Sequence, residues 1–212
     1  MKQVRDDVAV WKGGAILGGL AAVCTLLVAA THSVTAPQIA ANEQAYLEQS
    51  LKPVLEGVEY DGMLSESTIE ILPPHDLPGN SPVTIYRVYA DDAPVAALFV
   101  VTARDGFAGP IRLLAGISAD GRITGVRVLS HRETPGLGDL IEAEKSDWIL
   151  QFNGRSLDDP PVASWAIKRD GGEFDQLTGA SITPRAVIKT IRDTLVYYGE
   201  NPETVFAEVE TQ

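Results

Sequence analysis

Three hydroxyl side chains lie close together near the C-terminal end of the chain, in the stretch DQLTGASITPRAV (residues 175–187). Thr178, Ser181 and Thr183 surround a Gly-Ala pair, and Pro184 suits the first position of a helix. One hydroxyl is enough to cap a helix start, and Thr183 is predicted to be that cap. Thr178 fits a turn that bonds its own backbone. Ser181 is left without a structural role.

A helix start behind a flexible approach is a good place for a phosphate group. The free backbone N–H groups of the first turn donate hydrogen bonds, and the helix dipole favours negative charge there. Gly179, which is expected to have a positive φ, and Ala180 form the approach. A neighbouring hydroxyl such as Ser181 could carry the phosphate covalently. The alternative is that all three hydroxyls serve only in capping and turns.

The second stretch of interest is the loop SHRETPGLGD (residues 130–139), which follows a predicted strand. Its proline and two glycines force a tight and exposed backbone course, as in many binding loops. Glu133 offers an acceptor, Thr134 offers a hydroxyl, and Gly136 lets a flat ligand approach the backbone. The alternative interpretation is a surface turn that has a structural role and binds no ligand.

Hydrolysis and metal binding are not supported by these residues. Ser130, His131 and Glu133 could not converge as a catalytic triad, because neighbouring strand residues point to opposite faces. The three histidines lack ligand spacing, and the single cysteine, Cys24, has no partner for a disulfide. We therefore predict no metal site and no catalytic residue.

The N-terminal part of the chain has the composition of a membrane anchor. Residues 13–34 form a stretch of 22 residues without Asp, Glu, Lys or Arg. As a helix they would reach about 33 Å, enough to cross a bilayer. A cleaved signal peptide is the alternative, but its apolar region is usually shorter. Gly14 and Gly18 form a Gly-x-x-x-Gly pair that suits a partner membrane subunit, although a lone glycine-rich helix is an equal alternative.

The charge is distributed unevenly along the chain. Lys2, Arg5 and Lys12 outweigh the two acidic residues before the anchor, so residues 1–42 carry a net charge of +1 and the remainder carries −13, for a total of −12. Such an acidic body argues against nucleic acid as a partner, because the phosphates would be repelled. The basic residues before the anchor predict a cytoplasmic N-terminus and a body on the opposite side of the membrane.

Hydrophobic patterning then predicts the elements that position the two stretches. We expect an α+β fold, with one N-terminal transmembrane helix, a stalk helix that Pro53 bends or ends early, and a small antiparallel sheet with flanking helices. Asp120-Gly121 is the predicted hairpin turn between the last two strands. The predicted strands span residues 83–90, 94–103, 111–119 and 122–130; helices span 39–57, 140–152 and 184–198; and a strand and turn span 162–172.

The two stretches together closely resemble the G subunit of the Rnf (Rsx) electron-transport complex and, more distantly, the C subunit of the sodium-translocating NADH:quinone reductase. The resemblance rests on HRETPGLGD and DGGEFDQLTGASITPRAV and covers nearly the whole chain. It implies covalent FMN, joined through its phosphate to a hydroxyl side chain. The implied attachment motif consists of Asp175, Thr178, Gly179, Ala180 and the acceptor Ser181. Most comparable members have threonine at the acceptor position.

The resemblance also implies flavin contacts from Glu133, Thr134, Gly136 and Leu137, with Lys168 near the phosphate or the ring. Thr183 is the alternative acceptor. The implied domains are a cytoplasmic head (1–12), a transmembrane helix (13–34), a stalk and the start of the extracytoplasmic domain (35–93), an FMN-binding domain (94–198) and a tail (199–212).

The implied function is electron transfer within an ion-translocating ferredoxin/NAD complex of the bacterial inner membrane, with the FMN domain on the periplasmic side. The implied partners are membrane and iron-sulfur subunits of that complex and a magnesium-dependent flavin transferase that acts on FAD. Two alternatives remain: the corresponding subunit of the quinone reductase, and a non-redox assembly subunit.

Overall fold

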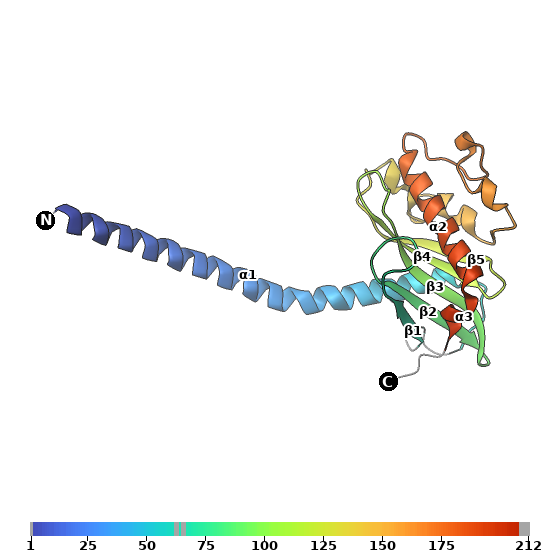
Figure 1. The fold of residues 1–212 in the computed structure, drawn as a ribbon, viewed down its shortest axis with the longest axis horizontal. Coiled ribbons are helices and arrows are strands. Elements are labelled where there is room, and N and C mark those ends of the chain that lie inside the picture. The colour runs from blue at the N-terminus through green and yellow to red at the C-terminus, as the bar shows by residue number, and fades with distance from the viewer. Residues whose placement is uncertain (1, 62–63, 65–66, 208–212) are drawn as a thin grey trace. The chain divides into compact units, whose positions relative to one another are not determined.

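The computed structural model describes residues 2–61, 64 and 67–207. The chain divides into two compact units, residues 1–48 and residues 49–212, and each is described by itself. Figure 1 shows the long N-terminal helix and the globular part that carries the sheet.

The N-terminal helix, α1 (Lys2–Val54), is continuous through the predicted span and the predicted stalk. The stalk is therefore not a separate helix as predicted, because Pro37 does not interrupt α1. Within the described residues, the segment Leu17–Pro37 is the one helix long and apolar enough to cross a membrane. Pro53 lies next to the end of α1, which confirms the prediction that this proline ends the helix early.

The hydroxyl side chains within the apolar part of α1 are satisfied by the helix itself. Thr25, Thr31 and Thr35 each donate to the carbonyl oxygen four residues earlier, and Ser33 donates to the one three residues earlier. Such local bonds remove the need for water or another helix as a partner, and they make this polar content compatible with lipid.

The globular unit is built on a five-stranded antiparallel sheet with the strands in chain order. The strands are β1 (Thr68–Ile71), β2 (Val83–Ala90), β3 (Ala93–Ala103), β4 (Ile111–Ser118) and β5 (Ile123–Ser130). All four predicted strands are confirmed to within one residue, and β1 was not predicted. Gly121, with a φ of 80°, lies in the predicted turn between β4 and β5.

A pair of glycines lets the end of α1 approach one face of this sheet. Gly116 of β4 and Gly125 of β5 are directly opposite each other in the register. A Cβ atom at Gly125 would lie 2.9 Å from the Cα atom of Val54, and one at Gly116 would lie 2.5 Å from a methyl group of the same residue. Val54 is fully buried in this contact.

The opposite face of the sheet is covered by the C-terminal helix α2 (Ile182–Glu200), followed by the short helix α3 (Pro202–Phe206). Figure 1 shows α2 crossing the strands. The predicted packing stripe of α2 is confirmed, since each of its members is buried: Val187, Ile188, Ile191, Leu195 and Tyr198. Helix α2 packs mainly on β3, and this packing fixes the position of its N-terminal end.

Between β5 and α2 the chain forms short 3-10 turns instead of the predicted elements. The turns are η1 (Gly138–Ile141), η2 (Asp147–Phe152), η3 (Val162–Ser164) and η4 (Lys168–Asp170). The prediction of one helix over residues 140–152 is wrong, because Ser146 turns the chain and donates to the carbonyl oxygen of Leu140 at 2.6 Å. Of the predicted strand and turn over 162–172, the strand is wrong apart from a single bridge between Ile167 and Phe174. The turn is present at Gly171, which has a φ of 85°.

An aromatic cluster holds these turns against the sheet. The ring of Phe152 lies 4.9 Å from that of Phe174 and 5.5 Å from that of Trp148, and the ring of Trp165 lies 4.8 Å from that of Phe174. All four side chains are buried. Aromatic burial of this kind contributes strongly to the core, and it explains how a segment with little regular structure keeps a defined course up to the start of α2.

Candidate functional site

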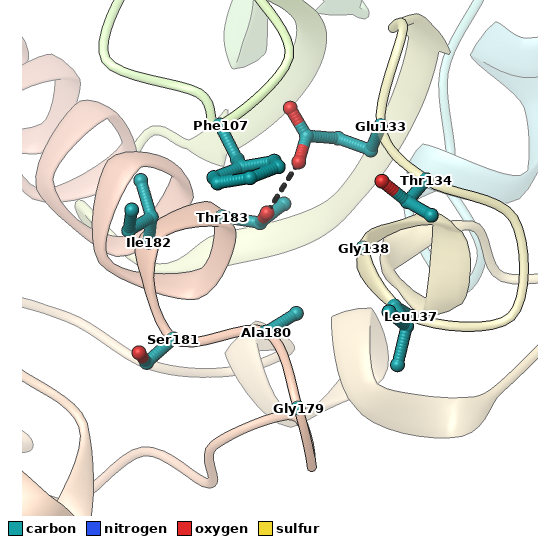
Figure 2. Close-up of a pocket in the computed structure, with 10 residues that line it drawn as sticks. All are labelled: Phe107, Glu133, Thr134, Leu137, Gly138, Gly179, Ala180, Ser181, Ile182 and Thr183. Atoms are coloured by element: carbon teal, nitrogen blue, oxygen red, sulfur yellow. Dashed lines mark hydrogen bonds between the residues drawn. The ribbon is translucent and has the colours of Figure 1, made fainter.

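Three chain segments far apart in sequence meet at one cleft of about 180 Å³. They are the loop between β3 and β4, the loop after β5, and the segment that leads into α2. Figure 2 shows Ser181 and Ile182 on one side of the cleft and Thr134, Leu137 and Gly138 on the other. The lining residues are Phe107, Glu133, Thr134, Leu137, Gly138, Gly179, Ala180, Ser181, Ile182 and Thr183. The two stretches singled out in the sequence thus form a single site.

The hydroxyl of Ser181 has no structural task at the start of α2. Helix α2 begins at Ile182, so Ser181 occupies the N-cap position, yet its side chain makes no capping hydrogen bond. Pro184 lies in the first turn, although it is not the first helical residue as predicted. Gly179 has a φ of 81°, which confirms the expected turn and brings the half-buried Ser181 to the wall of the cleft.

The predicted role of Thr183 as the N-cap is wrong. Thr183 is inside α2, only 1 % exposed, and its hydroxyl donates a 2.5 Å hydrogen bond to Oε2 of Glu133. The sequence showed a hydroxyl before a proline, but it could not show that a carboxylate from a distant loop would lie beneath the first turn of α2. This partner holds the Thr183 hydroxyl inside the protein.

Glu133 joins all three segments of the cleft. Its side chain comes from the loop after β5 and is 4 % exposed. One carboxylate oxygen accepts from Thr183 in α2, and the other accepts from the backbone N–H of Ala108 in the β3–β4 loop at 3.0 Å. A buried carboxylate is tolerated where hydrogen bonds replace its hydration. Glu133 therefore lies at the cleft wall with both oxygens engaged by protein groups.

The loop after β5 is shaped by its glycines. The backbone N–H groups of Leu137 and Gly138 both donate to the carbonyl oxygen of Thr134, at 3.2 and 3.1 Å. Gly136 has a φ of 77° and is exposed beside the cleft, outside its lining. A Cβ atom at Gly138 would come within 2.8 Å of Oε2 of Glu133. Position 138 must therefore be glycine, because any side chain there would collide with the Glu133 carboxylate.

A charged network supports the same loop from behind. Nδ1 of His131 accepts the backbone N–H of Glu133 at 2.9 Å, and Nε2 lies 2.6 Å from Glu142. Lys145 bridges Glu142 at 2.7 Å and Asp139 at 2.8 Å. The hydrogen bond from Lys145 lowers the pKa of Asp139, although burial of this carboxyl opposes that effect. The network therefore fixes both ends of the loop.

Besides Gly136, three predicted site residues lie outside the cleft lining: Lys168, Asp175 and Thr178. Lys168 forms an ion pair with Asp175 at 2.6 Å, and both side chains are largely exposed. The backbone of Asp175 is held by the Gln151 side chain at 2.7 Å and the Trp148 ring nitrogen at 2.6 Å. Thr178 is exposed and lies in the sequence between Asp175 and the cleft residue Gly179. The Lys168–Asp175 ion pair is therefore on the surface, at the start of the predicted attachment motif (residues 175–181).

Three residues of the cleft were not predicted as site residues: Gly138, which lies in the loop singled out from the sequence, Phe107 and Ile182. Phe107 belongs to the short loop Gly106-Phe107-Ala108-Gly109 between two strands, and Ile182 is the first residue of α2. An aromatic residue between glycines in a strand connection was the available signal for Phe107. Among the described residues, no group of three or more His, Cys, Asp or Glu side chains is placed to hold a metal ion.

The cleft suits a flat ligand that ends in a phosphate. A Cβ atom at Gly179 would lie 2.9 Å from Cδ2 of Leu137, so the backbone itself forms part of the wall. Apolar side chains line the opening, and the N-terminal end of α2 adjoins Ser181. Helix starts favour phosphate. A flavin mononucleotide has these two parts, and the residues present fit it.

Comparison with protein families agrees with this geometry. A model described as an FMN-binding domain matches residues 106–196, which include the whole cleft, and a model described as the RnfG N-terminal region matches residues 1–54. The fold and the cleft therefore define an FMN-binding domain that follows an N-terminal apolar helix.

Full-length relatives are named as the G subunit of an ion-translocating oxidoreductase complex. The chain is 40% identical over 207 residues to the one from Pseudoalteromonas atlantica, which covers 98% of this chain and 94% of the relative. It is 39% identical over 190 residues to the one from Shewanella amazonensis, covering 90% and 88%. For Pseudomonas aeruginosa the identity is 40% over 195 residues, covering 92% and 91%. The chain belongs to this family, the G subunits of ion-translocating oxidoreductase complexes.

Proposed function

We propose that this chain is a membrane-anchored flavoprotein subunit that carries FMN covalently on Ser181 and relays electrons within an ion-translocating oxidoreductase complex. The observation that carries this proposal is the Ser181 hydroxyl, which lies at the cleft of an FMN-binding domain and makes no capping hydrogen bond. Family membership supports the role within a complex.

The attachment transfers the FMN part of FAD to Ser181 as a phosphoester, and it needs a separate flavin transferase. The Ser181 oxygen forms a bond to the FMN phosphorus of FAD, the pyrophosphate bond of FAD breaks, and AMP leaves. The hydroxyl proton passes to the transferase or to water. Thr183 is a poor acceptor, because its hydroxyl is buried and donates to Glu133. The exposed pair of Asp175 and Lys168 adjoins the acceptor segment and supports a role for Asp175 in attachment.

A covalent link has a physical advantage in a domain outside the cytoplasm. Cofactor that is bound reversibly is lost when its free concentration falls, because occupancy follows mass action. A phosphoester to Ser181 removes that dependence. The flavin supplies the redox chemistry by accepting and passing on electrons, while the protein supplies position and electrostatics. Thr134, Leu137 and Gly179 of the cleft would hold it against the start of α2.

The membrane anchor determines on which side of the membrane the FMN domain lies. The segment Leu17–Pro37 is long enough to span the membrane once, and the basic residues before it favour a cytoplasmic N-terminus. The FMN domain then lies on the periplasmic side of the bacterial inner membrane. We propose ferredoxin and NAD as the redox couples of the whole complex, with iron-sulfur and membrane subunits as its other parts.

Retention of flavin through denaturation tests the proposal. The full chain is co-produced with a flavin transferase, denatured and precipitated with acid, and its flavin absorbance is measured. Wild type and Ser181→Thr should stay yellow, because both offer an alkoxyl group. Ser181→Ala should be colourless and equally stable, since no buried contact is lost. A colourless wild type would contradict the proposal and favour a non-redox assembly role.

A further inference from the structure

Phe107 is an aromatic side chain held at the edge of the cleft with most of its surface exposed. It is 66 % exposed, and Ile182 and Leu137 at the same cleft are 46 % and 41 % exposed. Figure 2 shows the Phe107 ring on the side of the cleft opposite Gly179. Large apolar side chains gathered at one place on a soluble surface indicate a ligand or a partner. Here they surround the opening of the cleft.

The loop that carries Phe107 is fixed at both ends. Asp105 pairs with Lys189 of α2 at 2.9 Å, and the backbone N–H of Ala108 donates to Glu133 at 3.0 Å. The turn itself is tight, because a Cβ atom at Gly106 would lie 2.2 Å from the carbonyl oxygen of Gly109. The exposed ring therefore stands on a braced loop, which is an arrangement suited to contact with a ligand.

The size of the cleft adds a second argument. Its volume of about 180 Å³ is below the roughly 300–1,000 Å³ of pockets that enclose a whole ligand. A flavin attached at Ser181 would thus extend beyond the cleft, across the apolar side chains at its opening. Phe107 has no polar atom, so its contribution to such a ligand is apolar and aromatic packing.

We propose that Phe107 packs on the isoalloxazine ring of the attached flavin and that Glu133 is the positioning residue that holds its loop. The inference rests on the proposed attachment of FMN to Ser181. Glu133 acts through Ala108 and Thr183, because both of its oxygens are engaged by these protein groups. Phe107 and Ser181 then approach the flavin from two separate segments, which the Glu133 carboxylate ties together.

Flavin fluorescence of the full chain tests this inference in two ways. A ring packed on the isoalloxazine shields the flavin from iodide, and an indole in the same place quenches flavin emission by electron transfer, which a Phe ring does not do. The flavin-loaded wild type is compared with Phe107→Leu, which loses the ring, and with Phe107→Trp, which places an indole there. Leu72→Ala is the control, since Leu72 is 63 % exposed and lies outside the cleft. Emission is expressed per flavin found on Ser181 by peptide mass.

Phe107→Trp should lower emission per bound flavin several-fold, because the indole would lie against the isoalloxazine. Phe107→Leu should increase quenching by iodide, because the ring that covers the flavin is lost, while Leu72→Ala should match the wild type in both readouts. Glu133→Gln keeps an acceptor for Thr183 and should increase quenching by iodide as Phe107→Leu does. Unchanged emission in Phe107→Trp or unchanged iodide quenching in Phe107→Leu, with flavin still on Ser181, would overturn this inference and leave the proposed function intact. A normal signal from Glu133→Gln would overturn the positioning role. A wild type without flavin on Ser181 would overturn both proposals.

Discussion

The hydroxyl of Thr183 donates a 2.5 Å hydrogen bond to Oε2 of Glu133, a residue 50 positions earlier in the chain. Both side chains are buried. The bond joins the first turn of α2 to the loop after β5, and the other oxygen of Glu133 joins the β3–β4 loop. The geometry of the cleft therefore depends on one carboxylate and its two donors.

Thr183→Val should destabilise the fold, because it keeps the shape of the side chain and leaves a buried carboxylate oxygen without its donor. We expect a loss of about 1–3 kcal/mol in the free energy of unfolding, measured by urea denaturation in detergent. Thr183→Ser should retain most of the stability, and Thr178→Val, at an exposed site, should change it by less than about 0.5 kcal/mol. Equal stabilities for Thr183→Val and wild type would show that the hydrogen bond from Thr183 to Glu133 does not stabilise the fold.

Gly179→Ala should impair flavin attachment in addition to straining the backbone. A φ of 81° costs an alanine about 1–2 kcal/mol, and the new Cβ atom would meet Leu137 at 2.9 Å inside the cleft. Gly154→Ala is the matched control, since Gly154 has a φ of 76° and no atom nearby. Thermal unfolding should reveal similar strain in both variants, whereas flavin absorbance after denaturation should fall only in Gly179→Ala. Full flavin attachment in Gly179→Ala would contradict a close approach of the flavin to the backbone at Gly179.

Lys145→Met should change how stability depends on acid. The hydrogen bond from Lys145 lowers the folded-state pKa of Asp139 below its usual 3.8. Because this pKa is lowered on folding, the pair stabilises the fold above the unfolded-state pKa, and the contribution is lost as pH falls through the folded-state pKa. The variant should unfold at a lower temperature than wild type near pH 7, and the difference should shrink below about pH 4.

Lys189→Met provides the control for this acid dependence. Lys189 lowers the pKa of Asp105 through a similar hydrogen bond, but the Asp105 side chain is 66% exposed whereas that of Asp139 is 6% exposed. Solvent and salt screen an exposed pair. Its removal should therefore have a smaller effect that disappears in high salt. An equal effect of both variants would contradict the supporting role assigned to Lys145.

Asp175→Asn should lower flavin attachment without lowering stability. The Lys168–Asp175 pair is exposed, so its loss should change the unfolding free energy by at most about 1 kcal/mol. Lys168→Gln removes the same ion pair and keeps the Asp175 carboxylate. If the carboxylate itself serves attachment, only Asp175→Asn should lose covalent flavin. Equal losses in both variants would instead assign the role to the ion pair.

The sheet and the packing face of α2 could be predicted because their causes are local. Runs of apolar and β-branched residues between turn residues set β2 to β5, and the 3.6-residue spacing of Val187, Ile191 and Tyr198 set the buried face of α2. Gly121 and Gly179 were predictable for the same reason, since their turns need a positive φ.

The features that were missed depend on contacts between distant residues. The apolar spacing in residues 140–152 fits a helix, but Trp148 and Phe152 pack on Trp165 and Phe174 from 3-10 turns. Such tertiary packing overrides a local pattern. Thr183 was assigned to capping for a similar reason, because nothing in its neighbourhood in sequence reveals the Glu133 carboxylate. Phe107 lies in a loop whose position depends on that same carboxylate.

Peptide mapping of the flavin tests the central claim most directly. The full chain, co-produced with a flavin transferase, is digested with a protease, and the yellow peptide is identified and sequenced by mass spectrometry. We predict one flavin phosphate per chain, on the peptide that contains residues 175–187, with the fragment ions placing it on Ser181. An FMN adduct on Thr178 or Thr183, or a flavin that separates from the chain on denaturation, would contradict this claim.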